Sequence, residues 1–563
     1  MKSNLRIGEG CALSKHKLKY AYIRYFSLLA ALTIMCLEAR AQSPDHSGAV
    51  PPGIDTTSNV RDTITIEEVQ VNTGYQRLPK ERATGSFVQI DNELLNRSVS
   101  TNLLERLDGI TNSVLFDKRG AKPRIQVRGL NTLTQHMSEP LIVVDNFPYE
   151  GDIGDINPND VENITVLRDA AASSIWGARA ANGVIVITTK RGAFNKPGRV
   201  HFNSNVTIME RTNLFDRPEP GPKDIIEMEK FLFDKGYFDA QIADRTGFPA
   251  LTPVVEILAA QRDGRLSEQE AMAELGRLSE NDARKDFEKY IYRPAVNQQY
   301  NAGISGGAGN ISYYLSAGVD KNIEELVGNT YDRVSLRSTT TYRPYKTLTV
   351  EIGLGYTEHR DINNSLGGYG SAAYKFGSRT MPNYHSLLNE DGGANSIDLD
   401  YRALFTDTAG NGMLLDWKYR PLDEMAVQDR SSRGRAMTGN LAINYEIAPF
   451  LVADVRYQYQ QTQRTDRDYY SGENFYARNL INLFSVPDGG EMRYGVPNDG
   501  ILDLTTTGIQ SHSIRGQLNF ENTYGLHSIN TFAGGEARQA MNAANMYRTY
   551  GYSDVLKIGR AHV

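Results

Sequence analysis

Cysteine is nearly absent from this chain of 563 residues, and the two that occur, Cys11 and Cys36, both lie within its first 41 residues. A disulfide framework or a cysteine-ligated metal is therefore not expected in the rest of the protein. Long apolar runs are also missing, because the run at 26–37 is far shorter than the roughly 20 residues that a membrane-spanning helix needs. A net charge of −6 gives no reason to expect a nucleic-acid partner.

Motifs for catalysis and metal binding are missing as well. The nine histidines are scattered without an i,i+4 pair, and no phosphate loop (G-x-x-x-x-G-K-[ST]) occurs. Asp152, Asp155, Asn157 and Asp160 could hold calcium. Their order departs from that of a calcium loop, so an Asx-rich turn is the preferred interpretation. We expect no enzyme activity, no cofactor and no metal.

Residues 1–41 have the features of a signal peptide. Basic residues precede the apolar run, and the small residues that a signal peptidase reads follow at 39–41, which predicts cleavage before Gln42. A lipid anchor at Cys36 is the alternative, although residues 33–35 are not the small residues expected before such a cysteine. Residues 42–72 then read as a flexible tether, rich at first in Pro, Ser, Gly and Asp.

Two regions with different patterns follow the tether. Residues 73–196 mix a short helix at 103–107, opened by Asn102 and Glu105, with short β-branched runs, and this predicts an α/β domain. The expected strands of this domain lie at 124–128, 141–145, 164–167 and 184–189.

From 197 to 557 the pattern has a period of two, with apolar residues such as Val200 and Phe202 alternating with polar ones. We expect about nine strands here. Short turns are predicted at 306–310, 343–347, 448–450 and 525–527, and they alternate with long excursions at 210–294, 320–330, 358–434 and 464–510. Loops sorted in this way favour an outer-membrane barrel, with a secreted protein of several β-sandwiches as the alternative.

The stretch 168–192 (RDAAASSIWGARAANGVIVITTKRG) could be a ligand-binding loop or scaffolding. Because no phosphate-loop spacing is present, we interpret Gly177 and Gly183 as the corner that turns a short helix back into a strand. Trp176 is expected to pack against this domain or the barrel wall, with a substrate contact as the alternative.

Several phrases of the chain resemble one known family. They are PRIQVRG at 123–129, EPLIVVDNFP at 139–148 and INPNDVENITVLRD at 156–169, which continues into the stretch just described. Together they resemble the plug domain of TonB-dependent outer-membrane receptors, and the motifs are most similar to those of the SusC/RagA nutrient importers. The barrel-side stretch at 303–318 is similar to that family's first periplasmic hairpin. The plug-motif positions are Arg128, Gly129, Asp145, Arg168, Asp169, Gly177, Arg179, Asn182 and Gly183.

The resemblance implies a transmembrane β-barrel in the cell outer membrane, with an N-terminal α/β plug domain in its lumen. Full-length relatives would have about 22 strands, of which about nine are present here. Arg128 and Arg168 would pair with barrel glutamates, and ordinary structural ion pairs are the alternative.

The resemblance also implies a TonB box, the tether segment that adds as a strand to the energy-coupling protein TonB. A plain strand of the next domain is the alternative interpretation, and the box could occupy either half of the range. Its candidate residues are Asp62, Thr63, Ile64, Thr65, Ile66, Glu67, Glu68, Val69, Gln70 and Val71.

The implied function is TonB-dependent active import of nutrient oligomers, either glycans or peptides. The implied partners are the TonB complex, a SusD/RagB-like surface lipoprotein acting as a lid, and outer-membrane lipid. A surface-exposed binding or adhesion protein that uses the barrel only as an anchor is the alternative. Finally, residues 558–563 (IGRAHV) match the translation of a common sequencing adapter, so we expect them to be non-native and the gene to be cut short there.

Overall fold

The computed structural model describes residues 70–75, 77–79, 86–111, 114–117, 124–127, 139–168, 174–371, 381–389, 391–525 and 527–560. The predicted signal peptide and residues 62–69 of the predicted TonB box lie outside these ranges, as do Arg128, Gly129 and Asp169.

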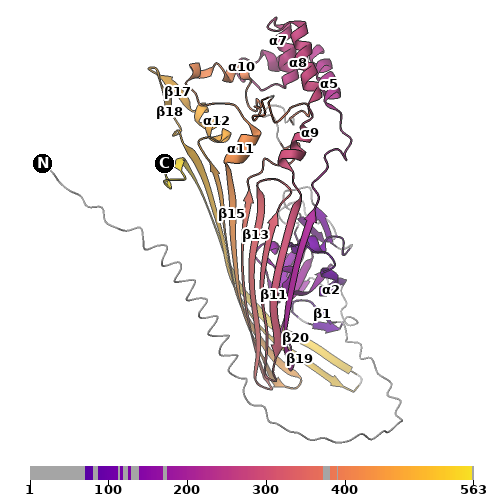
Figure 1. Ribbon diagram of the computed structural model, residues 1–563. Coiled ribbons are helices and arrows are strands. Elements are labelled where there is room, and N and C mark those ends of the chain that lie inside the picture. The colour runs from indigo at the N-terminus through magenta and orange to yellow at the C-terminus, as the bar shows by residue number, and fades with distance from the viewer. Residues whose placement is uncertain are drawn as a thin grey trace, which may run out of the picture. The chain divides into compact units, whose positions relative to one another are not determined.

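A large antiparallel sheet dominates the described residues, in which ten strands pair in chain order (Figure 1). Nine of them are long, which is the number that the alternating pattern predicts. The strands are β10 (Lys196–Met209), β11 (Ala295–Gly307), β12 (Ile311–Ile323), β13 (Asn329–Tyr345), β14 (Leu348–Asn363), β15 (Gln428–Ala448), β16 (Leu451–Tyr470), β19 (Gly500–Tyr524), β20 (His527–Ser553) and β21 (Ile558–Arg560).

The two faces of this sheet are inverted relative to a soluble protein. On β12, Ser316 and Asp320 are buried, whereas Val319 between them is 46% exposed. On β10, Val200 and Phe202 are 74% and 70% exposed. An apolar outer face and a polar inner face are what a strand needs when lipid lies on one side of it and the lumen of a barrel on the other.

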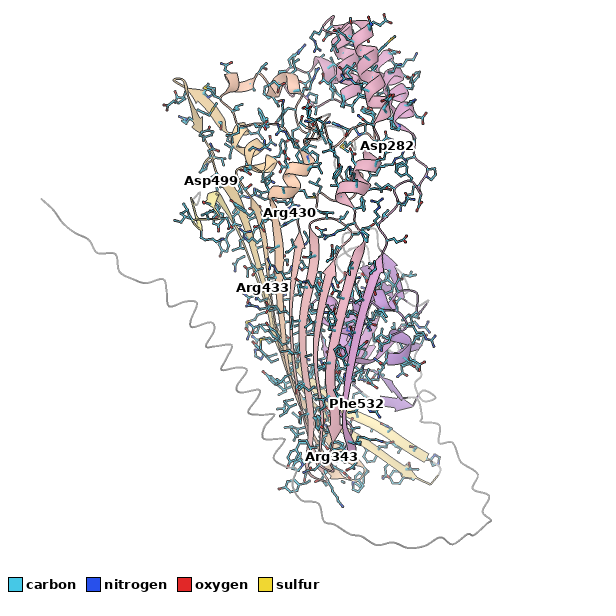
Figure 2. The ribbon with its side chains drawn as sticks, in the orientation of Figure 1. Asp282, Arg343, Arg430, Arg433, Asp499 and Phe532 are labelled. Carbon is cyan, nitrogen blue, oxygen red and sulfur yellow. The ribbon has the colours of Figure 1, made fainter. Side chains whose placement is uncertain are left out.

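Short turns join the strands at one end of the large sheet and long excursions join them at the other, as the sequence predicts. Residues 308–310, 346–347, 449–450 and 525–526 join strands by short turns, and the long excursions 210–294, 364–427 and 471–499 connect the opposite ends. Figure 2 shows Arg343 at the short-turn end and Arg430 and Asp499 at the other. The predicted excursion at 320–330 is wrong, because β12 and β13 continue until only residues 324–328 join them. Asp320 and Asn322, which that predicted excursion includes, are inward-facing strand residues that are buried.

The long excursions contain the helices that lie outside the α/β domain. Those of the first are α5 (Pro222–Asp234), α6 (Asp239–Ala243), α7 (Pro253–Arg262), α8 (Glu268–Glu280), α9 (Ala283–Asp286) and the π-helix η6 (Phe287–Ile291). The later ones contain α10 (Ala403–Thr406), η7 (Ala409–Gly412), α11 (Pro421–Val427), α12 (Phe475–Leu483) and the hairpin of β17 (Ser485–Asp488) and β18 (Glu491–Tyr494). Within the described residues, no helix combines the length and the apolar character needed to cross a bilayer.

The α/β domain has its own sheet, ordered β3-β8-β9-β6-β7 in the part of the chain that the structure describes. Only β6 and β9 are parallel among its pairs. Its strands are β3 (Phe87–Asp91), β6 (Leu141–Val144), β7 (Phe147–Pro148), β8 (Val161–Leu167) and β9 (Val184–Thr189). Separate hairpins join β1 (Gln70–Asn72) to β2 (Arg77–Pro79) and β4 (Val114–Asp117) to β5 (Arg124–Val127).

Apolar side chains cover both faces of this smaller sheet. One core packs the short helices α2 (Asn92–Leu95) and α3 (Leu103–Leu107) against β8 and β9, and the other gathers around Trp176. Every residue of β9 is buried, which explains its uninterrupted β-branched sequence. Asn102 caps α3 as predicted by accepting a hydrogen bond from the backbone N–H of Leu104.

Candidate functional site

A tight turn between β6 and β7 presents a carboxylate to the wall of the large sheet. Asp145 and Asn146 both adopt positive φ, at 48° and 78°, which Asp and Asn tolerate better than most residues. The Asp145 carboxylate accepts hydrogen bonds from the backbone N–H and the hydroxyl of Thr189 at 3.0 and 2.7 Å. It also forms an ion pair with Arg337 of β13.

The electrostatics of this pair favour a charged carboxylate. Burial acts to raise the pKa of Asp145, but Arg337, Arg191 and the hydrogen bonds from Thr189 outweigh it and hold the pKa below its usual range. Arg191 lies beside the same site and pairs with Glu351 of β14 at 2.9 Å. A cavity of about 20 Å³ between these groups has room for little more than a water molecule, so we interpret this contact as structural.

Arg333 makes a second contact between the domain and the wall. Its side chain is 1% exposed and pairs with Asp320 on the neighbouring strand β12. It also donates to the backbone carbonyl of Thr101 at 2.8 Å and to that of Gly154 at 2.5 Å. A single buried guanidinium thus joins two loops of the small domain to the inner face of the sheet.

The acidic cluster at 152–160 forms Asx turns and pairs with side chains of the large sheet. The side chains of Asp152 and Asn157 accept hydrogen bonds from backbone N–H groups two residues on, both at 2.9 Å. Asp155 pairs with His359 at 2.8 Å, and Asp160 accepts from Tyr314 at 3.0 Å. No group of residues suited to hold a metal ion occurs among the residues that the structure describes.

Residues 174–192 form the corner that the glycines of this stretch predict. The 3-10 helix η5 (Ser174–Ala180) is kinked at Gly177, where φ is 64°. Gly183 has φ +89°, and a Cβ there would lie 2.9 Å from Cγ1 of Val127. Its N–H closes the turn onto the carbonyl of Ala180.

The other predicted residues of this stretch have different neighbours. Arg179 pairs with Glu150 at 2.8 Å, and Glu150 also pairs with Arg538 of β20. The backbone N–H of Arg168 donates to Ser86. Asn182 lies in the turn that leads into β9. The proposed pairing of Arg128 and Arg168 with barrel glutamates stays a prediction.

Residues 72–75 are held by both the small domain and the wall. Asn72 donates to the hydroxyl of Thr188 at 3.1 Å, and the indole N–H of Trp176 donates to the carbonyl of Thr73 at 3.0 Å. On the wall side, Arg515 of β19 donates to the carbonyl of Gly74 at 2.9 Å.

Aromatic packing reinforces this segment. Tyr75 lies against Trp176, with ring centroids 4.6 Å apart, and the Arg515 guanidinium lies 3.6 Å from the centre of the Tyr75 ring. Burial raises the pKa of Tyr75 to about 12, which keeps its hydroxyl protonated as a donor to Glu536. Trp176 therefore packs against the domain, as predicted, with the arginine of the wall close by.

The described end of the predicted TonB box is already paired within the chain. Gln70 and Val71 belong to β1 and lie opposite Pro79 and Leu78 of β2. Strand addition to a partner through these two residues would require β1 to separate from β2.

The sequence reasoning missed the arginines of the wall, namely Arg333, Arg337 and Arg515. Arg333 and Arg337 are four residues apart on β13, so both point to the same face of the sheet. The sequence could have identified these two arginines as inward-facing, because they alternate with the apolar residues Val334 and Leu336. Both of these are 44% exposed and lie on the outer face.

Comparison with known proteins matches residues 79–184 to the family described as TonB-dependent Receptor Plug Domain. The TonB-dependent receptor SusC of Bacteroides thetaiotaomicron is 27% identical over 269 residues, which are 46% of this chain and 22% of that protein. The TonB-dependent receptor P26 of Formosa agariphila is 24% identical over 434 residues, or 76% of this chain and 38% of that protein.

Among solved structures, the RagAB peptide importer in its closed-closed state superimposes with a TM-score of 0.62 at 21% sequence identity. The match covers 85% of this chain and 51% of that chain, and at this identity it shows a shared fold. This chain therefore spans well under half the length of these curated relatives and about half of the solved one.

Proposed function

We propose, from the premise that this chain is a SusC/RagA-type TonB-dependent receptor of the outer membrane, that it takes part in TonB-dependent import of nutrients. The small domain is then the plug and the large sheet is barrel wall. One observation carries the proposal: the plug covers the polar inner face of a sheet whose outer face is apolar, through contacts such as those of Arg333, Arg337 and Arg515.

The chemistry of these contacts suits a plug that must move. They are hydrogen bonds, both to backbone carbonyls and between side chains, and a small number of ion pairs, rather than a continuous apolar core. Such polar contacts break one at a time, and each typically contributes about 1–3 kcal/mol. The plug can thus close the pore at rest and still be displaced by a force applied to its N-terminal segment.

The cargo we propose is an oligomer of sugars or amino acids. The support comes from relatives, since the solved RagAB protein is described as a peptide importer and SusC is a curated TonB-dependent receptor.

A surface lipoprotein of the SusD/RagB type is the partner that we propose for the outer end. The helices of the first excursion support a protein partner, because Phe231 of α5 and Met272 of α8 are 60% and 63% exposed. Co-purification of the tagged receptor from outer membranes should recover such a lipoprotein in about equal amount. Its absence from membranes that contain the receptor would remove this partner.

Uptake by living cells tests the proposal against the alternative of an adhesion or binding protein without transport. The probes are a fluorescently labelled casein hydrolysate for peptides and a labelled mixture of plant polysaccharide oligomers for glycans. Import predicts that at least one probe accumulates inside receptor-bearing cells and that a protonophore abolishes this. An adhesion protein predicts surface binding that the protonophore leaves unchanged.

A further inference from the structure

Arg515 binds the plug in addition to its ion-pair partner within the large sheet. Its cross-strand neighbour in the register is Glu536 of β20, and the two form an ion pair at 2.6 Å. Its remaining N–H groups donate to the carbonyls of Gly74 and Asn146, both at 2.9 Å. The side chain is only 3% exposed.

The two carbonyls belong to separate parts of the plug. Gly74 follows β1, directly after the predicted TonB box, whereas Asn146 lies in the turn between β6 and β7. The guanidinium also covers the Tyr75 ring, whose hydroxyl donates to Glu536 at 3.0 Å. Gly74 allows this close approach: its φ is +88°, and a Cβ there would lie 2.4 Å from the Trp176 ring.

The contacts of Arg515 can open without leaving a buried charge alone. When residues 73–75 move away, the guanidinium loses a carbonyl and an aromatic face but keeps the carboxylate of Glu536. Asp145 of the plug and Arg337 of the wall, in contrast, are each other's counter-charge. Separating them leaves two buried charges unpaired, which costs far more free energy. A pull on the N-terminal segment should therefore open the Arg515 contacts first.

We propose that Arg515 is a releasable latch, which holds residues 73–75 against the barrel wall and ties them to the Asp145–Asn146 turn. The identity of what pulls rests on the proposed function, but the latch itself does not. When the segment is released, the turn keeps its contacts with Arg515 and Arg337, so the β6–β7 hairpin is displaced only in a second step.

Hydrogen exchange on the full-length receptor in detergent tests the latch without any transport. In the parent, the amides of 70–75 should exchange before those of 141–148. Arg515→Gln should speed exchange across 70–75 by about tenfold or more, since it removes charge-assisted hydrogen bonds that hold the segment closed. Tyr75→Leu, which alters no wall residue, should act in the same direction if Arg515→Gln does not fold.

Arg548→Gln is the matched control. Arg548 lies on β20 opposite Asp503 of β19, so it forms the same kind of cross-strand ion pair between the same two strands. Its partners Asp503 and Tyr476 both lie outside the plug. It should change exchange at 70–75 by less than about twofold. The latch is refuted if folded Arg515→Gln exchanges like the parent, or if Arg548→Gln accelerates 70–75 equally. A protein that shows the latch but imports nothing would instead contradict the proposed function alone.

Discussion

At the scale of single residues, buried charges determine how firmly the plug is seated. Asp145 is the plug carboxylate that faces Arg337, and its exchange for asparagine leaves that arginine buried without its counter-charge. We expect Asp145→Asn to weaken the seating of the plug by about 3–5 kcal/mol. The measurement is the leak conductance of the full-length receptor in planar bilayers, which should rise.

Arg179→Gln is the control for this variant. Arg179 also belongs to the plug motif and pairs with a carboxylate, but its side chain is half exposed, and such pairs contribute about 0–1 kcal/mol. Its leak should stay near that of the parent. Equal conductance in Asp145→Asn and the parent would show that the Asp145–Arg337 pair does not hold the plug.

A second residue-scale prediction concerns the effect of pH on the long excursion 364–427. Burial raises the pKa of Asp398 to about 6, with Glu256 and Asp407 acting in the same direction. Because the folded pKa lies above the unfolded value of about 4, the neutral carboxyl stabilises the fold below pH 4, and this contribution is lost as the pH rises through about 6.

Tryptophan fluorescence can follow this change. Trp417 is one of the two tryptophans of the chain and lies in the same excursion as Asp398. Its ring centroid is 5.5 Å from that of Tyr401. We expect a transition near pH 6 in the parent and none in Asp398→Asn, whose side chain cannot ionise. Asp407→Asn should keep the transition. An unchanged transition in Asp398→Asn would assign it to another group.

At the scale of elements, the inverted faces of the strands make the strongest prediction. Leu354 lies in the middle of β14 and is 56% exposed on the apolar face. Leu354→Arg should destabilise the inserted barrel by about 2–4 kcal/mol if that face meets lipid. Leu354→Ala, which stays apolar, should insert normally, as judged by heat-modifiable migration of outer-membrane fractions. Normal insertion of the arginine variant would mean that this face does not meet lipid.

The strands of the wall could be predicted from the sequence because each strand has different surroundings on its two faces. Apolar and polar residues therefore alternate along every strand, independently of the other strands. It failed at 320–330, where Asp320 and Asn322 are polar on account of the plug and not of a loop. The corner at Gly177 and Gly183 was also predictable, because the backbone conformation there depends only on residues that are close in the sequence.

The contacts between plug and wall could not be predicted in this way. Arg515 and Gly74 are 441 positions apart, and Arg337 and Asp145 are 192 apart. Alternation shows which face of a strand an arginine occupies, but the register between two domains depends on how they pack. The sequence therefore identified the plug and the wall, and the structure was needed to identify the side chains that join them.

At the scale of the whole molecule, a short segment lies between the plug and the wall, and we propose that a partner pulls on it. Residues 72–75 bind both the plug, through Thr188 and Trp176, and the wall, through Arg515. A force on the residues before them is therefore applied where plug and wall meet. The predicted TonB box at 62–71 lies immediately before this point.

Deletion of residues 62–71 in the full-length receptor tests the central claim most directly. Uptake of the labelled casein hydrolysate and of the labelled oligosaccharides is measured in cells that carry the parent or the deletion, with surface amounts matched. The account predicts that the deleted receptor reaches the outer membrane and binds the same probe as the parent but accumulates none of it inside the cell. Equal accumulation in the two strains would contradict import energised through this segment.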